Sequence, residues 1–361
     1  MIFFEIILGL IILAILVIAH ELGHALQAIR SGVVVEEFGV GLPPRALKKK
    51  LKNGLLLTLN WLPLGGFVKL QGEYDSASNK GDYGAATFLQ KTKILLAGVT
   101  ANWLIAAVLL TFLAMTGMPK VLTNQFSIPS DSQVINQPVE IASILKDHAA
   151  EKAGLKVGDK IIRFDNEEVP TTERLIDLSR QKKGQSVNII YDRSGSEYKI
   201  EVKLGKDVST GILGAGLGQR QLIKSTWSAP IVGVATTAQF TWTTIQGLGD
   251  LIGNIATSGL KTAGDSVTGP IGILGTVFPA AEQNGPTQLV LLTAIISLSL
   301  AVMNILPIPA LDGGRWFTLV FFKLFKKKLT KEREEKIQAV GFYLLMTLII
   351  LVTINDVIRL F

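Results

Sequence analysis

The sequence contains no cysteine, so disulfide bonds and thiolate metal ligands are both unavailable to this chain. Histidine is scarce as well, with three residues in 361. No small-residue cleavage site follows the first apolar stretch, which argues against a cleaved signal peptide. We therefore expect that stretch to remain in the mature protein.

Long apolar segments dominate what is present. The chain is 48% hydrophobic, and its mean hydropathy of +0.40 is high for a soluble protein. Four segments approach the ~20 residues that a membrane span requires. They are residues 3–28, 94–116, 287–306 and 339–358. This pattern predicts a membrane protein with one polar module between the second and third segments.

The charged residues indicate an orientation. Residues 30–93 hold ten Lys/Arg against five Asp/Glu, residues 307–340 hold eight against four, and residues 117–286 hold seventeen of each. Cytoplasmic loops of membrane proteins carry an excess of Lys and Arg. Both basic loops are therefore predicted to face the cytoplasm, while both termini and residues 117–286 face outward.

His20, Glu21 and His24 form a His-Glu-x-x-His motif inside the first apolar segment. Residues four apart on a helix share a face, so both imidazoles can reach one metal ion, with Glu21 at the rim of that site. An ionisable residue at the centre of a membrane helix costs roughly 2.5–3.5 kcal/mol on insertion scales. Three of them in five residues indicate a bound metal and predict peptide hydrolysis inside a bilayer.

A third metal ligand is needed, because catalytic zinc sites usually take three protein ligands. Asp312 is the best candidate, since it follows Pro307 and Pro309 at the predicted cytoplasmic end of the third segment. Prolines interrupt a helix, and irregular backbone is tolerated at membrane depth where it lines a cavity. In the alternative interpretation, this stretch only turns the chain out of the membrane.

The two motifs together resemble the site-2 protease family of intramembrane zinc metalloproteases. Within it, the chain is similar to the bacterial regulator-of-sigma-E protease branch, with a single PDZ domain. The resemblance implies one Zn²⁺ per chain, bound by His20, His24 and Asp312, with Glu21 as the residue that activates water. Arg315 is a departure, because histidine is frequent at that position in relatives.

The resemblance also implies a set of substrate-contacting residues. They lie in three motifs, one after the first segment, one in the second and one in the third: Gly65, Gly66 and Phe67; Asn102, four residues after Gly98; and Asn304 with Pro307.

The first of these motifs matches the family's membrane-associated β-loop. Residues 55–59 and 67–70 are predicted as short strands flanking a turn at residues 63–66. A substrate helix must unwind to be cut, and an exposed strand edge near the zinc would pair with its freed backbone groups. The alternative is a buried hairpin that only packs the loop. Lys48, Lys49 and Lys50 are interpreted as a headgroup-contacting cluster and not as a nucleic-acid site.

Residues 141–204 alternate apolar and polar positions and predict a small α/β domain, in which residues 149–162 resemble the helix, turn and strand of bacterial PDZ domains. A helix is expected at residues 171–182, and a hairpin at residues 186–191 and 197–204. No peptide-binding loop is evident, so peptide capture and a steric role both stay open. Residues 210–218 are interpreted as the exit from the domain, and residues 227–258 as helices at the outer interface.

The expected fold is a polytopic α-helical membrane protein with four transmembrane helices, a membrane-associated β-loop and an inserted α/β PDZ domain. The predicted segments are a first helix (1–29), a cytoplasmic loop (30–93), a second helix (94–116), the PDZ domain (120–210), an interfacial linker (211–286), a third helix with the Asp-Gly motif (287–314), a basic cytoplasmic segment (315–338) and a fourth helix (339–361).

The predicted function is hydrolysis of peptide bonds within or near the spans of single-span membrane proteins, such as an anti-sigma factor or remnant signal peptides. The resemblance implies a bacterial inner-membrane location, an upstream site-1-type protease acting earlier on the substrate, and no nucleic-acid partner. A metal-ion transporter or sensor is the alternative, because intramembrane His and Asp also mark ion pathways. The position of Glu21 beside the first ligand favours the protease.

Overall fold

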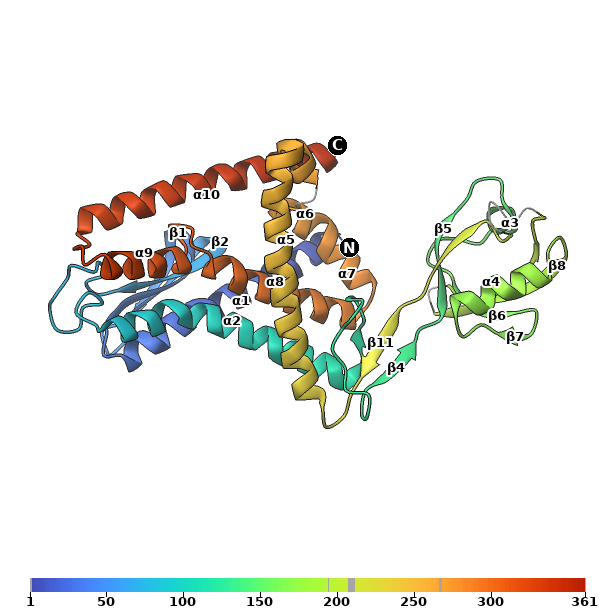
Figure 1. The fold of residues 1–361 in the computed structure, drawn as a ribbon, viewed down its shortest axis with the longest axis horizontal. Helices are drawn as coiled ribbons and strands as arrows, with labels where there is room; N and C mark the ends of the chain where they lie inside the picture. The colour runs from blue at the N-terminus through green and yellow to red at the C-terminus, as the bar shows by residue number, and fades with distance from the viewer. Residues whose placement is uncertain (1, 194, 207–211, 266–267, 361) are drawn as a thin grey trace. The chain divides into compact units, whose positions relative to one another are not determined.

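The computed structural model describes residues 2–193, 195–206, 212–265 and 268–360, and the chain divides into two compact units (Figure 1). The first unit comprises Met1–Leu113 and Pro230–Phe361, and the second comprises Ala114–Ala229. Each unit has its own sheets and helices.

Four described helices of the first unit are long and apolar enough to cross a membrane. They are α1 (Ile2–Arg30), α2 (Phe88–Thr116), α8 (Pro286–Ile305) and α10 (Lys331–Leu360). Each has between 20 and 30 residues, which matches the thickness of a bilayer's hydrocarbon core. Large apolar side chains such as Ile15, Val108 and Leu348 are exposed on them, as lipid contact requires. The prediction of four helices that can span a membrane is therefore confirmed by their length and composition.

A β-hairpin follows α1, formed by β1 (Val35–Lys50) and β2 (Leu56–Leu70). The two parts of β2 run in opposite directions: Leu56–Leu59 follow Glu37–Val40 in the same sense, whereas Gly66–Lys69 follow them in the opposite sense. The chain therefore turns between these parts, and the turn predicted at residues 63–66 is present. A second reversal, which the sequence reading did not predict, lies at residues 51–55, where the Gly54 N–H donates to the Leu51 carbonyl. The first part of β1 pairs with the last part of β2, and Gly39 lies opposite both Phe67 and Thr58.

A long helix, α5 (Ala229–Asp265), enters the first unit from the second. Figure 1 shows it running across the direction of α1, α2 and α8. Its buried face repeats every three to four residues and includes Val232, Thr236 and Phe240, while Trp242 is exposed. The prediction of several helices in residues 227–258 is wrong, because a single helix covers residues 229–265.

Three short helical segments connect α5 to α8. They are α6 (Pro270–Gly272), η1 (Ile273–Val277) and α7 (Phe278–Gln283). The buried carboxylate of Asp356 in α10 accepts hydrogen bonds from the Gly269 and Gly272 N–H groups at 2.9 and 2.8 Å. Leu274 and Phe278 lie against Gly9 of α1. These segments therefore tie the N-terminal half of α1 to the C-terminal half of α10.

The chain leaves α8 at Leu306 and begins a separate helix, α9 (Asp312–Leu324), at the predicted third ligand. Pro307 and Pro309 cannot continue the hydrogen-bonded helix, and Ala310 has a positive φ of 77°. The prediction that Asp312 lies on the third membrane helix is therefore wrong, because it is the first residue of α9.

The described residues of the second unit form two antiparallel sheets. The larger has the strand order β10-β5-β6-β8-β9, with β7 paired to β6, and the smaller has the order β3-β11-β4. The strands are β3 (Met118–Pro119), β4 (Gln133–Asn136), β5 (Val139–Ile144), β6 (Lys160–Phe164), β7 (Glu167–Glu168), β8 (Ser186–Arg193), β9 (Ser196–Lys203), β10 (Ala215–Gly218) and β11 (Gln221–Lys224). Gln137 donates its N–H to the Arg220 carbonyl at 2.8 Å, so the chain enters and leaves the larger sheet at neighbouring points.

Two helices cover the larger sheet, α3 (Ala149–Ala153) and α4 (Thr172–Gln181). Leu175 of α4 packs with Phe164 and Ile189 in one buried apolar cluster. The helix and the hairpin predicted for this domain are present. However, β10 pairs with β5 beyond residue 210, where the sequence placed the end of the domain. Of the predicted exit segment, residues 210 and 211 lie outside the described residues.

Candidate metal centre

His20 and His24 lie one helical turn apart on α1, on the face that α2 covers. Both are buried, with 7% and 8% of their surface exposed. The helices approach closely because residue 23 is a glycine, where an added Cβ would lie 2.7 Å from the Ala97 carbonyl oxygen. Small residues let helix backbones approach in this way in membranes. The two imidazoles are thereby enclosed between α1 and α2.

Asp312 reaches the same place from the start of α9. Gly313 and Gly314 allow the turn, since a Cβ at either would lie within 2.2 Å of a carbonyl oxygen, that of Ile305 or that of Ile308. Any larger residue would push the first turn of α9 away from the end of α8. The two glycines therefore place the carboxylate of Asp312 beside α1.

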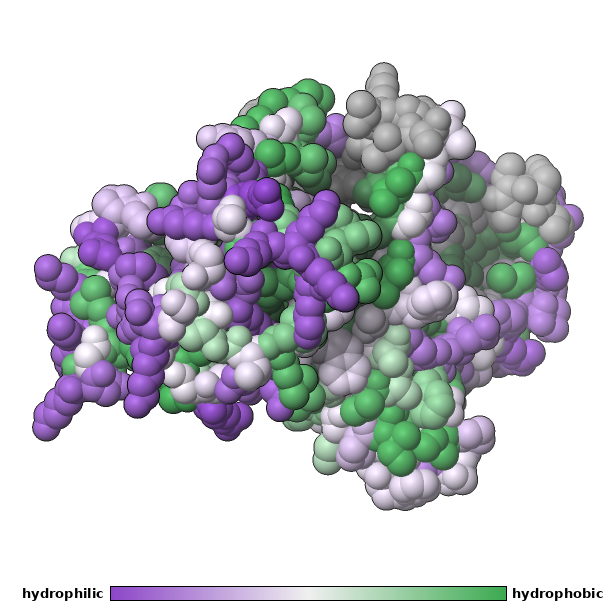
Figure 2. Space-filling model, turned by 60° about the vertical axis from the view of Figure 1, so that its left-hand side comes forward, coloured by the Kyte–Doolittle hydropathy of each residue, from purple (hydrophilic) through white to green (hydrophobic). Residues whose placement is uncertain are grey.

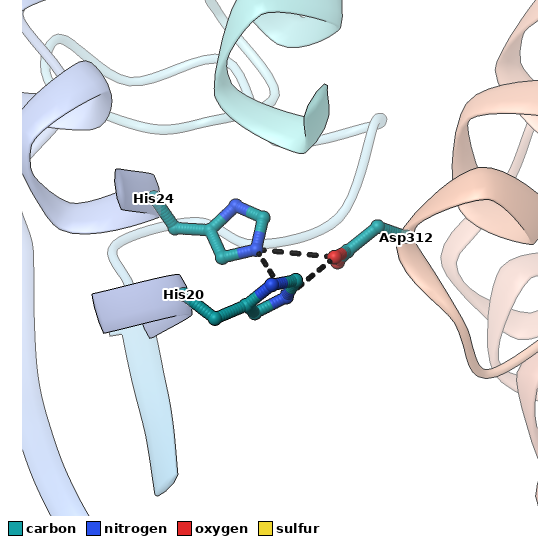
Figure 3. Close-up of side chains that lie close together, drawn as sticks. All are labelled: His20, His24 and Asp312. Carbon is teal, nitrogen blue, oxygen red and sulfur yellow. Dashed lines mark hydrogen bonds and ion pairs between the residues drawn. The ribbon is translucent and has the colours of Figure 1, made fainter. Parts of the chain in front are cut away.

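The three side chains converge, as Figure 3 shows. Asp312 Oδ2 lies 3.0 Å from His20 Nε2 and 3.1 Å from His24 Nε2, and the two histidine nitrogens lie 3.2 Å apart. Three ligands bound about 2.1 Å from one zinc ion in tetrahedral geometry would lie roughly 3.4 Å apart. The observed separations fall within a few tenths of an ångström of that arrangement.

The tautomer of His24 supports metal binding. His24 Nδ1 donates to the Ile94 carbonyl oxygen at 2.7 Å, which leaves the lone pair of Nε2 directed at the other two ligand atoms when the ring is neutral. A lone pair facing a carboxylate oxygen is repulsive unless a cation lies between them. Two imidazole nitrogens and one carboxylate oxygen are also a donor set that catalytic zinc accepts. The residues present therefore fit a zinc ion.

Gly98 of α2 leaves the space that the ion would need. A Cβ on this residue would lie 2.4 Å from His24 Nε2 and 2.7 Å from His20 Nε2. The sequence pointed to Gly98 only as part of a motif with Asn102. In the structure, the backbone of Gly98 borders the site, and the lack of a side chain there leaves the site open.

Glu21 lies beside the ligands and against the β-hairpin. The Val68 N–H is hydrogen-bonded to its carboxylate, and a Cβ on Gly66 would come within 3.2 Å of Glu21 Cγ. The last part of β2 therefore passes directly next to the residue predicted to activate water.

The other predicted substrate residues are dispersed. Phe67 packs its ring over Gly39, and Gly65 adopts a φ of +84° within β2. Asn304 donates to the Leu300 carbonyl within its own helix at 3.0 Å, and Pro307 is exposed in the loop that follows.

Asn102 is fully buried in α2. Neither its side-chain nitrogen nor its side-chain oxygen has a hydrogen-bond partner among the described residues. Its backbone carbonyl accepts a hydrogen bond from the Ser297 hydroxyl of α8 at 2.8 Å. In this structure Asn102 is therefore enclosed between helices and has no surface available to a substrate.

Several participants were not found from the sequence. The Ile94 carbonyl and the Val68 N–H are backbone groups, which carry no residue signature. Arg315 was noted only as a departure from relatives, although it makes ion pairs with Glu73 and Glu334 at 3.3 and 3.2 Å. An arginine three residues after a predicted metal ligand was the available signal.

Comparisons with known proteins agree with this arrangement. The model of peptidase family M50 matches residues 8–348. A candidate zinc metalloprotease of Clostridium acetobutylicum is 30% identical over 356 residues, covering 99% of this chain and 98% of that protein. The zinc metalloprotease RasP of Geobacillus kaustophilus is 27% identical, with 98% and 97% covered. A PDZ domain from Listeria monocytogenes matches 22% of this chain and 86% of its own length, at 26% identity and a TM-score of 0.21. The chain therefore belongs to peptidase family M50, the site-2 proteases, and is a zinc metalloprotease of the intramembrane type.

Proposed function

We propose that this protease holds its zinc ion with His20, His24 and Asp312 and uses Glu21 as the base that takes a proton from the attacking water. The observation that carries the proposal is the convergence of three ligand atoms within 3.2 Å of one another. They come from two helices, α1 and α9, and the ligands His24 and Asp312 are 288 residues apart in sequence. Such a convergence of buried polar groups among apolar helices has no ordinary packing explanation.

The chemistry is divided among a few groups. Zinc, when bound, polarises the scissile carbonyl and makes water more acidic. Glu21 accepts the proton of that water and returns it to the leaving amine. The Val68 N–H holds the Glu21 carboxylate in place. The Ile94 carbonyl fixes the ring of His24 in the orientation that exposes Nε2.

The last part of β2 is suited to hold an unwound substrate. Residues 66–70 pair with residues 35–40 of β1 on one edge, and no further strand pairs with them in the described part of the chain. The Val68 N–H is hydrogen-bonded to Glu21, so the other edge of this strand runs past the catalytic residue. A substrate segment added to that edge would satisfy backbone groups that lipid cannot. We assign Gly65, Gly66 and Phe67 to this strand-pairing role.

Asn304, Pro307 and Asn102 keep only part of the role implied by the resemblance. Asn304 lies in the last turn of α8 and Pro307 lies in the break that precedes α9, which supports a role for both in bordering the substrate near Asp312. Asn102 is enclosed, and its contact with a substrate would require α2 and α8 to separate.

The proposed substrates are single-span membrane proteins, and the active site of the protease is proposed to face the cytoplasm. The lysines at positions 48–50 and 326–328 are exposed. Figure 2, in which the end of the first unit carrying the hairpin comes forward, shows hydrophilic side chains over much of that face. By the positive-inside rule this end belongs in the cytoplasm. A bacterial inner-membrane location and an upstream protease that first trims the substrate complete the proposal. The matching family model and the relatives named above are peptidases, which favours the protease over the metal-ion transporter or sensor.

The second unit, proposed as an extracytoplasmic PDZ domain, would limit which substrates enter. Its chain continues directly into α2 and α5, so a folded domain accompanies the catalytic helices. The competing role is capture of a new C-terminus. In that role, the new C-terminus would bind in the cavity of about 360 Å³ between α4 and residues 212–217.

The test compares matched carboxylate variants on the same helix. Glu21→Gln should reduce cleavage of a single-span reporter in vesicles by at least about a hundredfold, the usual contribution of general acid–base catalysis. It should retain about one zinc per chain. Glu5→Gln, at another buried carboxylate of α1, should leave cleavage unchanged. His20→Ala, His24→Ala and Asp312→Ala should each lose zinc and activity together. Stoichiometric zinc in Asp312→Ala would refute the third ligand.

A further inference from the structure

Arg315 occupies a partly buried position one helical turn after Asp312. Its side chain is 18% exposed, although a guanidinium normally remains in water. Nε lies 3.2 Å from Glu334 Oε1 of α10, and Nη1 lies 3.3 Å from Glu73 Oε1 in the loop after β2. Nη2 also donates to the Glu73 carbonyl oxygen. One side chain thus joins α9 to two other segments.

An aromatic ring completes this environment. The guanidinium carbon lies 4.8 Å from the centre of the Tyr83 ring. Tyr83 is fully buried, and burial raises the pKa of its hydroxyl above the ordinary value, so the ring stays neutral beneath the cation. A planar guanidinium can stack on a ring and form forked hydrogen bonds at once, which a lysine ammonium cannot.

The segments that hold Arg315 are themselves ordered. Tyr83 donates its N–H to the Gln71 carbonyl at 2.8 Å, which closes the loop that begins at the end of β2. Glu334 is 2% exposed, and its second oxygen accepts the Asp75 N–H at 3.0 Å. Of the two carboxylates that pair with the cation, that of Glu334 is therefore fixed by its surroundings, whereas the Glu73 side chain is 41% exposed.

The position of Arg315 in α9 matters because of what precedes it. Residues three apart on a helix share a face, so an anchor at 315 limits the rotation of the turn that begins with Asp312. Gly313 and Gly314 have no side chains to provide such an anchor. Arg315 is thus the first residue after the ligand whose side chain can fix this turn. Trp316, which donates to the Thr92 hydroxyl at 3.1 Å, fixes the turn to α2.

We propose that Arg315 is a positioning residue for the metal centre, which sets the location of Asp312 relative to His20 and His24 by anchoring the first turn of α9 to Glu73 and Glu334. It does not touch the substrate. The inference rests on the proposed role of Asp312 as the third zinc ligand. Because Glu73 follows the β2 strand beside Glu21, the same anchor also fixes the distance between the third ligand and the strand edge.

The test measures zinc affinity in the purified full-length protein in detergent, by competition with a chelator. Arg315→Met should raise the zinc dissociation constant by about 10- to 100-fold, as loss of groups that orient metal ligands typically does. Arg315→Lys should give an intermediate value, because it keeps the charge and loses the planar fork. Cleavage by Arg315→Met should recover substantially at saturating zinc, since Arg315 is assigned no contact with the substrate.

A matched control separates positioning from general stability. Arg193 makes a comparable paired contact with Asp159 in the second unit, at 2.6 and 2.7 Å. Arg193→Met should lower the thermal stability of the chain and leave zinc affinity unchanged. If Arg315→Met lowers the melting temperature but binds zinc within twofold of the wild type, Arg315 is only structural and the proposal is wrong.

A second variant keeps the test decisive if Arg315→Met does not fold. Glu73→Gln removes one charged partner, keeps the contact with the Glu73 carbonyl, and should weaken zinc binding a few-fold. Unchanged affinity in both Glu73→Gln and Arg315→Lys would overturn the proposal. A wild-type protein that binds no zinc would instead contradict the proposed function, so the two failures are distinguishable.

Discussion

Substituting Gly98 by alanine tests the metal centre through its geometry, without removing any ligand. The added Cβ would lie 2.4 Å from His24 Nε2, whereas real Cβ atoms essentially never come closer than 3.0 Å to a neighbour. The imidazole must therefore recede by 0.6 Å or more. Catalytic and metal sites need their groups within about 0.5 Å of the productive arrangement, so this displacement exceeds the tolerance.

The added carbon also competes with the ion for space. A zinc ion held by both histidines would lie about 2.0–2.1 Å from each nitrogen. The Cβ introduced at position 98 would lie 2.4 and 2.7 Å from the same two atoms. We expect the zinc dissociation constant to rise at least about tenfold, which corresponds to roughly 1.4 kcal/mol. Cleavage should fall at least in proportion when zinc is limiting.

Two opposing effects decide the stability of this variant. Replacing glycine by alanine within a helix favours folding by roughly 0.5–1 kcal/mol. Overpacking of a tight site typically costs about 1–3 kcal/mol, so the clash should prevail and the metal-free protein should melt at a lower temperature. Thermal unfolding with and without chelator, together with chelator competition, measures both quantities.

Gly249 of α5 provides the matched control. Apart from its own helix backbone and chain neighbours, no atom of the described residues lies within 4 Å of the place where its Cβ would be built. Gly249→Ala should therefore show only the helix-favouring effect, with zinc affinity unchanged. If Gly98→Ala binds zinc within twofold of the wild type, the ion does not lie between the two histidines beside α2, and the geometric argument is wrong.

Three further predictions concern orientation, access and acid stability. Because the chain is free of cysteine, single cysteines at Ser31 and Lys328 should react with an impermeant thiol reagent only from the cytoplasmic side, and one at Asn166 only from outside; reversed labelling would overturn the orientation. Replacing residues 138–219 by a two-residue Asn-Gly turn should let untrimmed substrates be cut and leave trimmed ones little changed, whereas slower cleavage of trimmed substrates would favour peptide capture. Desolvation raises the pKa of Asp131, but hydrogen bonds from Ser228 and Thr226 outweigh it and hold that pKa at about 2. The carboxylate therefore stabilises the fold fully above the ordinary aspartate pKa, and this stabilisation is lost as the pH falls through about 2. The melting temperature of Asp131→Asn should thus lie below that of the wild type at pH 7, with the difference closing toward pH 2; a constant difference would refute this.

The metal ligands were predictable because their constraints are local. Helical periodicity puts His20 and His24 on one face, and the cost of ionisable groups in lipid makes an isolated motif improbable. Asp312 was marked by the prolines before it and the glycines after it. What the sequence could not give was the helix on which Asp312 lies. The chain resumes a helix at that residue only because Gly313 and Gly314 fit against the carbonyls of Ile305 and Ile308.

The β-hairpin shows how a stronger signal was overlooked. Asn53-Gly54 is the pair most typical of a tight hairpin turn, and the chain does reverse there. The glycines at 65 and 66 looked like a turn as well. In the structure, Gly65 has a positive φ where the two oppositely directed parts of β2 meet, so it does belong to a turn, and Gly66 leaves room for Glu21. Glycine marks close approach as readily as it marks a turn, and only the tertiary contact decides which.

The end of the inserted domain was missed for a related reason. The sequence Ala215-Gly-Leu-Gly218 has low strand propensity and is only four residues long. It forms β10 because β5 offers a pairing edge, although β5 lies more than 70 residues earlier in the chain. Pairing between such distant segments leaves no local pattern to detect.

The site is assembled mainly by the absence of side chains. Gly23 allows α1 to meet α2, Gly98 leaves the ion its space, Gly66 brings β2 against Glu21, and Gly313 brings α9 to the end of α8. Helices in lipid gain no hydrophobic driving force from contact with one another, so close packing of small residues must hold them together. Those contacts involve only protein atoms. The ligands are therefore preorganised by the glycines, and a methyl group at any of these four positions should weaken metal binding or catalysis even where the membrane helices still assemble.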